Sequence, residues 1–246
     1  MKAIMREIRI YQAGDYTSGQ VLELSSEAGQ HIAVVLRMQV GEPLTVFNGR
    51  NDEFQSTITM IKKKQVFVSL NSMEEVNRES PLMIHLGQAI SKGDRMEWVM
   101  QKSVELGVAS ITPLITERCV VKLDKERMLK KVLQWQAIVV AACEQCGRNK
   151  IPQVHSPVYL EQFLQTVQLP LKFILHTQAA KTWRDYQFNS AELALIIGPE
   201  GGLTDTEVSL AFSHQFSPLS LGPRILRTET AAISALSLLQ AVGGDL

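Results

Sequence analysis

The chain has 246 residues, 45% of them hydrophobic and 20% charged, which is the composition of a globular protein with room for one large or two ordinary domains. No run of about 18 uncharged apolar residues occurs, so no membrane span is expected, and three cysteines are too few for a disulfide framework. Twenty-five basic residues balance 25 acidic ones, which argues against a strongly basic nucleic-acid-binding domain but does not exclude a basic face. The basic N-terminus lacks a following apolar stretch, so we expect a cytoplasmic protein without a secretory signal.

Residues 9–70 contain short apolar groups separated by glycines, and apolar residues alternate with polar ones in FQSTITM and QVFVSL. This pattern is typical of short strands joined by turns, with one helical turn expected between His31 and Met38. The segment Asn71–Pro81 is polar, lacks periodicity and ends in proline. We therefore predict a small β-barrel domain over residues 1–72 and a second domain over residues 73–246.

The second domain is predicted to begin with a strand–helix–strand unit. An apolar stretch near residues 82–90 is followed by a loop, and Asp94 and Glu97 have the spacing of a capping box. Gly107 ends the helix, and VASITPL is the next strand. The expected buried face of the helix comprises Met96, Val99, Met100 and Val104. Alternation of strands and helices indicates a parallel α/β sheet.

A long helix is predicted from about Lys125 to Cys146 and is closed by Gly147. Cys143 and Cys146 have the spacing of a C-x-x-C motif. A zinc site needs four ligands, however, and the sequence holds no second pair of this kind. We interpret both cysteines as buried small residues and predict no metal site.

Two glycine-containing loops dominate the C-terminal region. The apolar run Leu193–Ile197 stops at the first loop, Gly198–Gly202, and Thr204 and Glu207 then have capping-box spacing. A second short apolar run leads to the loop that starts at Gly222, and the turn RTET opens the last helix. The carboxyl ends of strands in an open α/β sheet usually hold the ligand, so these loops are expected to form one crevice.

Other catalytic signatures are missing from the sequence. It contains no G-x-G-x-x-G, no G-x-x-x-x-G-K-[ST], no H-E-x-x-H and no G-x-S-x-G. The signatures of dinucleotide-binding, P-loop, zinc-protease and nucleophile-elbow proteins are therefore lacking.

The motifs IGPEGG and LGPRILRTETA, in this order, resemble the RsmE family of bacterial ribosomal RNA methyltransferases, which belong to the SPOUT (α/β-knot) class. The resemblance extends through KGDRMEWVMQKSVELGV, PLITERCVVK and EQCGRNKIPQV and covers nearly the whole chain. It implies an α/β fold, with an N-terminal PUA-like RNA-binding β-barrel and a SPOUT trefoil-knot domain whose cofactor-binding knot spans about residues 172–240. This sequence departs from the family pattern at Cys119 and Cys146, where the family usually has serine.

The resemblance also implies S-adenosylmethionine as cofactor, 16S ribosomal RNA within the small subunit as substrate, and a homodimer. The residues expected to bind the cofactor are Leu175, His176, Ile197, Gly198, Pro199, Glu200, Gly201, Gly202, Ser220, Leu221, Gly222, Leu226, Arg227, Thr228, Glu229, Thr230 and Ala231. The residues expected to contact RNA are Arg6, Arg9, Arg37, Lys92, Arg95, Lys102, Arg118, Arg148 and Arg224.

The implied reaction is methylation of N3 of a uridine near the decoding region. N3 carries a proton and is a poor nucleophile, so catalysis needs deprotonation and stabilisation of negative charge on the neighbouring carbonyl oxygens. We expect Arg227 to stabilise this charge and Glu229 to accept or orient the proton. Alternatively, these two residues form a structural ion pair. Two other functions stay open, namely methylation of another RNA base or of a ribose 2′-hydroxyl, and a non-catalytic RNA-binding role in ribosome assembly.

Overall fold

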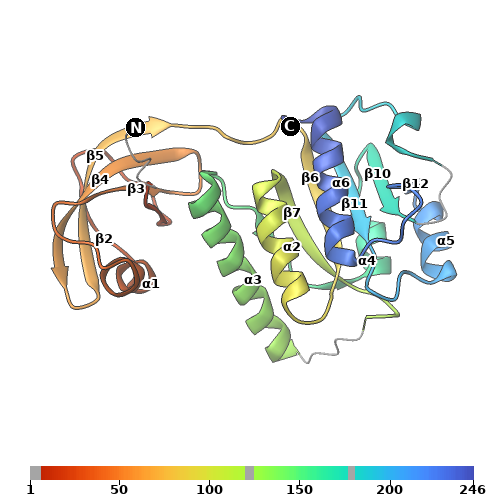
Figure 1. Ribbon diagram of the computed structural model, residues 1–246, viewed down its shortest axis with the longest axis horizontal. Coiled ribbons are helices and arrows are strands. Elements are labelled where there is room, and N and C mark those ends of the chain that lie inside the picture. Colours follow the sequence, from red (N-terminus) through yellow and green to blue (C-terminus); the bar gives the residue numbers. More distant parts are fainter. Residues whose placement is uncertain (1–6, 120–124, 177–180) are drawn as a thin grey trace. The chain divides into compact units, whose positions relative to one another are not determined.

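The computed structural model describes residues 7–119, 125–176 and 181–246 (Figure 1). The chain divides into two compact units, Met1–Glu79 with Cys143–Ile151, and Ser80–Ala142 with Pro152–Leu246. The boundary predicted after residue 72 falls inside a strand that runs from Gln65 to Glu75. The segment Cys143–Ile151 also joins the first unit although it lies far along the sequence, which local pattern alone did not indicate.

The first unit is built on a five-stranded sheet with the order β1-β3-β4-β5-β2. β1 pairs parallel with β3, and the other neighbours are antiparallel. The strands are β1 (Arg9–Tyr11), β2 (Val21–Glu23), β3 (Pro43–Phe47), β4 (Asp52–Lys62) and β5 (Gln65–Glu75). The predicted alternation is confirmed, because Phe54, Ile58, Val66, Val68 and Leu70 are all buried in one core. Helix α1 (Ser26–Gln30) continues into a π-helical turn, His31–Leu36, where one helical turn was predicted.

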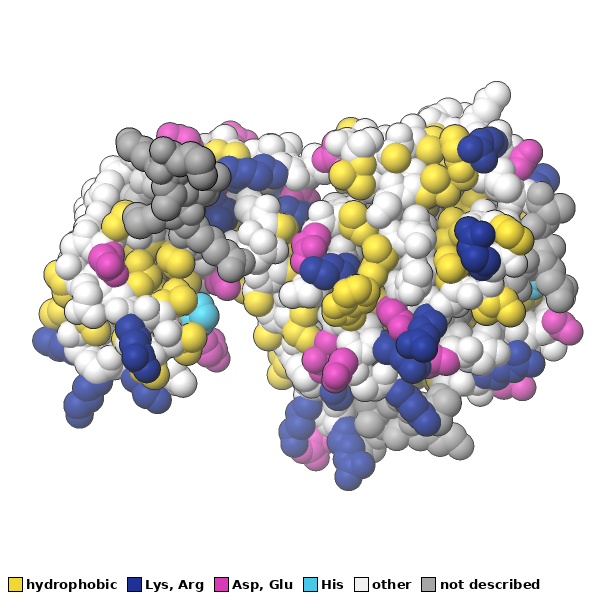
Figure 2. All heavy atoms as spheres, in the orientation of Figure 1, with side chains coloured by type: hydrophobic (Ala, Val, Ile, Leu, Met, Phe, Trp, Pro, Cys, Tyr) yellow, Lys and Arg dark blue, Asp and Glu magenta, His cyan; other side chains and the backbone are white. Residues whose placement is uncertain are grey.

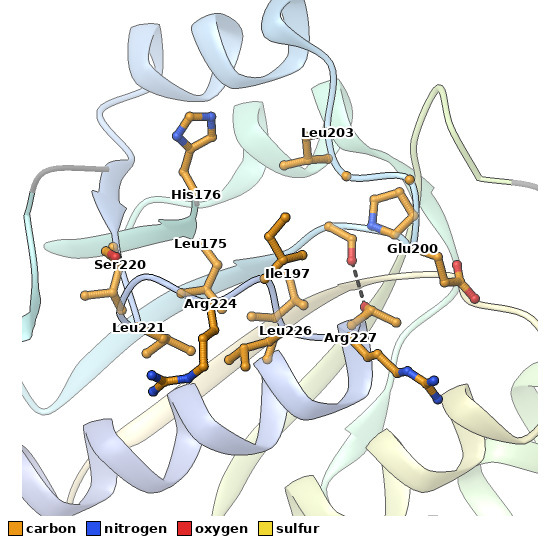
Figure 3. A pocket seen from close by; sticks show the side chains of 18 of the residues that line it. Leu175, His176, Ile197, Glu200, Leu203, Ser220, Leu221, Arg224, Leu226 and Arg227 are labelled. Atoms are coloured by element: carbon orange, nitrogen blue, oxygen red, sulfur yellow. Dashed lines mark hydrogen bonds between the residues drawn. The ribbon is translucent and has the colours of Figure 1, made fainter. Parts of the chain in front are cut away.

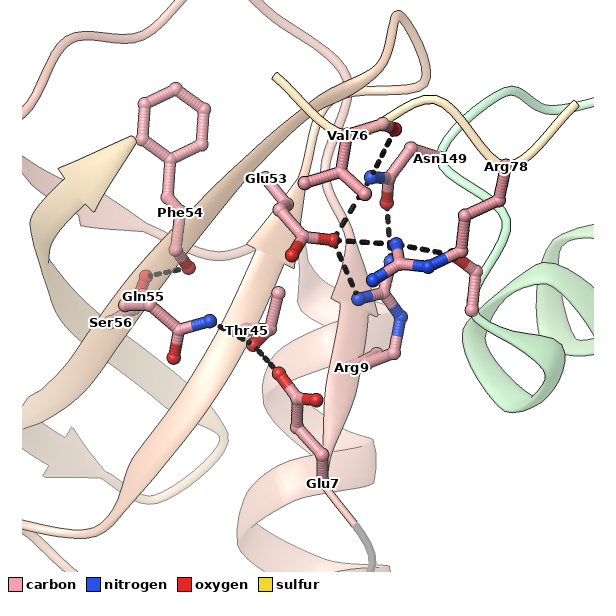
Figure 4. Close-up of polar contacts among 11 residues, drawn as sticks. Glu7, Arg9, Thr45, Glu53, Phe54, Gln55, Ser56, Val76, Arg78 and Asn149 are labelled. Atoms are coloured by element: carbon pink, nitrogen blue, oxygen red, sulfur yellow. Dashed lines mark hydrogen bonds and ion pairs between the residues drawn. The ribbon is translucent and has the colours of Figure 1, made fainter. Parts of the chain in front are cut away.

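A buried charge cluster lies beside this sheet (Figure 4). Oε2 of Glu53 accepts hydrogen bonds from Arg9 (3.0 Å), Arg78 (3.0 Å) and Asn149 (2.9 Å). Asn149 comes from the segment after α3 (Lys125–Cys146) and also accepts a hydrogen bond from Arg9. Burial alone would raise the pKa of Glu53, but the hydrogen bonds from Arg78, Asn149 and Arg9 outweigh it and lower the pKa to about 2.

The second unit is built on a sheet of seven strands with the order β12-β10-β11-β6-β7-β8, and β9 also pairs with β7. Every neighbouring pair is parallel, as the strand–helix–strand pattern predicted. The strands are β6 (Met83–Ala89), β7 (Val108–Ile115), β8 (Gln153–Val154), β9 (Val158–Tyr159), β10 (Leu171–Leu175), β11 (Glu192–Ile197) and β12 (Ser217–Leu219).

Helices cover both faces of this sheet, which explains why its strands read as continuous apolar runs. On one face, Ala194 and Ile196 of β11 pack with α4 (Leu160–Thr166) and α5 (Asp205–Ser213). On the other face, α2 (Asp94–Glu105) packs against α6 (Thr228–Gly243) (Figure 1). The predicted buried face of α2 is confirmed, because Met96, Val99, Met100 and Val104 are at most 1% exposed.

The remaining helices are α3 (Lys125–Cys146), with the predicted bounds, and a 3-10 turn at Trp183–Asp185. The capping box predicted at Thr204 and Glu207 is present, with both reciprocal hydrogen bonds. The box predicted at Asp94 and Glu97 is wrong. Gly93 occupies the N-cap of α2 with φ +59°, and Asp94 is already the first helical residue, so its side chain caps nothing.

The described surface carries charge of both signs. On the face seen in Figure 2, Lys and Arg side chains are interspersed with Asp and Glu side chains over both units. Among the described residues, no helix is long and apolar enough to cross a membrane. Within the same residues, no three His, Cys, Asp or Glu side chains gather as a metal-binding group.

Cys143 is fully buried, as predicted, whereas Cys146 is only half-buried. Burial raises the pKa of the Cys143 thiol to about 12. Because the thiolate is the reactive form, we expect iodoacetamide at pH 8 to alkylate Cys143 about a thousandfold more slowly in the folded protein than in urea-unfolded protein. Peptide mass spectrometry over time would measure both rates, with half-buried Cys119 as the internal reference. Equal folded-state rates for Cys143 and Cys119 would contradict this expectation.

Candidate functional site

A cavity of about 650 Å³ opens at the carboxyl ends of β10, β11 and β12 (Figure 3). The loops that follow β11 and β12 form two of its walls, and the beginning of α6 closes it. The apolar side chains of Leu175, Ile197 and Leu226 line it. The crevice predicted from the two glycine loops therefore exists, at the sheet edge where strand ends and a helix N-terminus present free N–H groups.

The first wall is the tight turn from Gly198 to Gly202, in which the N–H of Gly202 donates to the carbonyl of Pro199 (2.9 Å). Gly202 has φ +70°, a conformation that favours glycine. At Gly198 a Cβ atom would lie 3.1 Å from Cγ of Leu203, so a larger residue would crowd the turn. Three of the five residues in this wall are glycines, which have only backbone to present to the cavity.

The second wall runs from Ser220 to Arg227. Gly222 has φ +107°, and its N–H donates to the hydroxyl of Ser220 (3.2 Å). No atom lies within 4 Å of a Cβ placed on Gly222. Arg224 and Arg227 extend from this loop, and both are exposed (Figure 3). Arg227 occupies the N-cap of α6, so a cationic side chain stands at the entrance to the helix.

A buried threonine ties the two walls together. The hydroxyl of Thr228, in the first turn of α6, donates to the carbonyl of Gly198 (2.7 Å). The same oxygen accepts a hydrogen bond from Nε2 of Gln88 (3.0 Å), which lies on β6 and is fully buried. Thr228 thereby fixes the start of α6 against the end of β11.

We expect Thr228→Val to lower the free energy of unfolding by about 1–3 kcal/mol, because the Gly198 carbonyl and the Gln88 amide lose a buried partner. Urea denaturation followed by circular dichroism would measure the change. Thr230→Val is the matched control, since Thr230 is exposed on the same helix, and its effect should stay within about 0.5 kcal/mol. Equal effects of both substitutions would refute the role of the Thr228 hydroxyl.

Two arginines from neighbouring segments, one in a helix and one in a loop, donate hydrogen bonds to the first wall. Arg95, in α2, donates to Oε1 of Glu200 (2.8 Å), and the N–H of Lys92 donates to the same oxygen (3.1 Å). Arg118, after β7, donates to the carbonyl of Gly201 (2.9 Å). Both arginines line the cavity. Their guanidinium groups are thus already engaged by the loop that forms the wall.

The residues predicted to bind a cofactor all line this one cavity except Glu229 and Thr230. Sequence reasoning missed Leu203, Asp205, Leu219 and Ile225 as lining residues. Each lies within a few positions of a predicted residue, so treating the loops as continuous walls would have included them. Ile225 is 87% exposed. The sequence alone does not indicate this exposure, because an apolar residue is usually expected to be buried.

The residues predicted to contact RNA belong to both units, and Arg95, Arg118 and Arg224 line the cavity. Arg6 lies outside the described residues. Arg37, Lys92 and Arg224 are exposed, and Lys102 is half-buried in an ion pair with Glu105 (2.8 Å).

Two of these predictions need correction. Arg9 is buried at 8% exposure and binds Glu53, and Arg148 is 5% exposed and donates to Glu79 from Nε (3.0 Å). Both guanidinium groups therefore serve internal ion pairs rather than an RNA-facing surface. The motif positions alone could not reveal this, because each acidic partner lies about 44 to 69 residues away in sequence.

Comparison with known proteins identifies the family. The model of the RNA methyltransferase domain matches residues 78–240, and that of the RNA methyltransferase PUA domain matches residues 24–71. Ribosomal RNA small subunit methyltransferase E of Buchnera aphidicola from Schizaphis graminum is 39% identical over 97% of this chain and 97% of its own. This chain belongs to the ribosomal RNA small subunit methyltransferase E family.

Solved structures agree with membership of the methyltransferase E family. A Legionella pneumophila methyltransferase in complex with S-adenosylmethionine is 66% identical, has a TM-score of 0.97, and is matched over 98% of this chain and 100% of that chain. The methyltransferase E of Neisseria gonorrhoeae, bound to S-adenosylmethionine, is 36% identical with a TM-score of 0.92 over 98% and 99% of the two chains. The family resemblance inferred from IGPEGG and LGPRILRTETA is therefore confirmed.

Proposed function

We propose that this protein transfers a methyl group from S-adenosylmethionine to N3 of a uridine in 16S ribosomal RNA of the small subunit, near the decoding region. The observation that carries the proposal is the cavity bounded by the two glycine loops at the carboxyl ends of β10, β11 and β12. The protein's membership of the family supports the same function, because two of its relatives have been solved with this cofactor bound.

The cavity suits this cofactor chemically. Its walls offer backbone N–H and carbonyl groups that match the hydrogen-bonding edges of adenine and the ribose, and apolar side chains such as Leu175 and Leu226 can contact the ring. Gly202 and Gly222 have positive φ, and no atom lies within 4 Å of a Cβ built on either, so a ligand can approach their backbone closely. We propose that the lining residues predicted from sequence hold the cofactor, with Arg227 contributing only its backbone.

When bound, S-adenosylmethionine supplies an electrophilic methyl group on a sulfonium. For methyl transfer, N3 of uridine would have to release its proton to solvent and bond to the methyl carbon, and the electron pair of the broken carbon–sulfur bond would stay on sulfur. Arg227 is placed at the cavity and exposed, so its guanidinium is suited to stabilise negative charge on the uridine oxygens. Glu229 does not line the cavity, so we do not retain it as the proton acceptor.

Several finer features belong to this proposal. We propose that the first sheet closes into a PUA-like barrel, that the region of about residues 172–240 forms a trefoil knot, and that the protein acts as a cytoplasmic homodimer. β12 lies beside β10 although β11 intervenes in sequence, which supports a crossing of the chain in this region. Among the proposed RNA contacts in the described part of the chain, exposed Arg37, Lys92, Arg118 and Arg224 form no ion pair.

The function is tested with purified protein, labelled S-adenosylmethionine and small ribosomal subunits from cells that lack this activity. Digestion to nucleosides and mass spectrometry should reveal N3-methyluridine as the labelled product. Another methylated nucleoside, or a 2′-O-methylated ribose, would refute the proposed target. Absence of both label and cofactor binding would favour a non-catalytic RNA-binding role in ribosome assembly.

A further inference from the structure

The ion pair between Arg95 and Glu200 links the start of α2 to the loop after β11. Glu200 belongs to the cavity wall after β11, and Arg95 belongs to the first turn of α2, which follows β6. Partial burial by itself would raise the pKa of Glu200, but backbone N–H groups and Arg95 outweigh it and lower the pKa. The carboxylate is therefore held in its charged form as a fixed partner of Arg95.

The same guanidinium also faces a second carboxylate. Nε of Arg95 lies 3.9 Å from Oε1 of Glu229, whose side chain is only 13% exposed. Oε2 of Glu229 is buried and has no hydrogen-bond partner. Among the described residues, Arg95 is the only basic side chain within 4 Å of Glu229. A buried carboxylate needs a compensating cation, so Arg95 stabilises the start of α6 as well as the β11 loop.

We propose that Arg95 is a positioning residue that sets the spacing of the two cofactor loops by bridging Glu200 in the first loop and Glu229 at the start of α6. This inference rests on the proposed function of the same cavity. It assigns Glu229 a role that acts through Arg95 and not through contact with the reacting atoms. It also assigns Arg95 to the protein's own carboxylates, whereas the sequence motif had indicated an RNA contact.

The bridge requires an arginine in particular. Nη1 faces Glu200 and Nε faces Glu229, so two edges of one planar group address two carboxylates at once. A lysine at this position has one compact ammonium group and can satisfy one of them fully. Loss of the bridge leaves each loop attached only through its other contacts, such as the bond between Thr228 and Gly198.

The test compares Arg95→Met, Arg95→Lys, Glu200→Gln and Glu229→Gln with the wild-type protein. Lys130→Met is the matched control, because Lys130 forms an exposed ion pair with Glu126 on α3. Calorimetry measures the Kd of S-adenosylmethionine, and filter binding measures the salt dependence of binding to small-subunit rRNA. We expect Arg95→Met to weaken cofactor binding about 10- to 100-fold and each glutamine variant to weaken it about 3- to 10-fold. Arg95→Lys should weaken cofactor binding less than Arg95→Met but measurably.

Coupling between the residues distinguishes a bridge from separate effects. In the Arg95→Met background, either glutamine substitution should change the cofactor Kd by less than about twofold, because the shared interaction is already lost. Fully multiplicative effects would overturn the proposal. If Arg95→Met does not fold, the near-isosteric Glu200→Gln and Glu229→Gln variants still decide, since unchanged cofactor affinity in both would overturn it.

The RNA measurements separate this role from phosphate binding. With a positioning role, the salt dependence of RNA binding stays that of the wild type in Arg95→Met. A loss of about one unit in the slope of log K against log salt, with unchanged cofactor Kd, would show that Arg95 binds a phosphate and would refute the bridge. A wild-type protein that fails to bind S-adenosylmethionine would instead refute the proposed function.

Discussion

Substituting Arg227 by methionine should lower kcat for rRNA methylation about 100- to 1,000-fold and leave the Kd of S-adenosylmethionine within about threefold of wild type. The proposed reaction places negative charge on the two uridine oxygens beside N3, and removing one preorganised donor to such charge typically costs this much in rate. Arg227 stands at the N-cap of α6, lines the cavity and forms no ion pair among the described residues. Its guanidinium is thus available to a bound substrate. Single-turnover kinetics with saturating cofactor would measure the methyl-transfer step.

Arg224→Met is the matched control for Arg227→Met. Both residues are exposed arginines on the same cavity wall, but we assign Arg224 to RNA phosphate. Its loss should raise the KM for small subunits and reduce the salt dependence of binding, with little change in the single-turnover rate. If Arg227→Met shows that same pattern and keeps its rate, Arg227 binds phosphate and the charge-stabilising role is wrong.

The largest effect on stability is expected for Glu53→Gln, which should lower the free energy of unfolding by about 3–5 kcal/mol, because the substitution leaves buried Arg9 without its countercharge. The Glu53 side chain is only 8% exposed, so solvent screens this interaction little. Urea unfolding at pH 7, followed by circular dichroism, would measure the difference. Asp15→Asn removes a carboxylate that is 84% exposed and paired with Arg50, and it should cost less than about 1 kcal/mol.

Glu53 should also give the first unit a characteristic acid sensitivity. Its pKa is about 2 in the folded protein against an ordinary value of 4.5, so the folded state favours the charged form. The resulting stabilisation, about 3 kcal/mol at most, is fully present above about pH 5 and is lost as the pH falls toward 2. Glu53→Gln should abolish this part of the pH dependence. If the free energy of unfolding has the same pH dependence in the variant and in the wild type, the assignment is contradicted.

The sequence predicted what depends on local pattern. Apolar periodicity found α2 and its buried face, and the bounds of α3 followed from its long amphipathic stretch and Gly147. The cavity was predictable because glycines that follow apolar runs mark strand ends, and parallel strand ends meet at one edge of a sheet. Most residues of the two cavity walls could therefore be predicted from the sequence of residues 193–231.

Pairings between distant residues were beyond this reasoning. The partners of Arg9 and Arg148 lie 44 and 69 residues away, so neither motif indicated that these cations are neutralised inside the fold. The same holds for Glu229, whose nearest cation is Arg95 and not its neighbour Arg227. The prediction that Asp94 caps α2 was wrong for a different reason. Gly93, with φ +59°, is the N-cap of α2, so the helix begins one residue earlier than the capping pattern predicted.

The assignment of Cys143–Ile151 to the first unit has a consequence for the order of events during synthesis. The amide of Asn149 completes the set of donors around Glu53, and the N–H of Tyr11 in β1 donates to the Glu144 carboxylate (2.9 Å). Neither the Asn149 amide nor the Glu144 carboxylate exists on a nascent chain that ends at Glu79. The first unit therefore acquires its last buried partners only after about seventy further residues have left the ribosome, which makes its maturation dependent on translation of Ser80–Ala142 of the second unit.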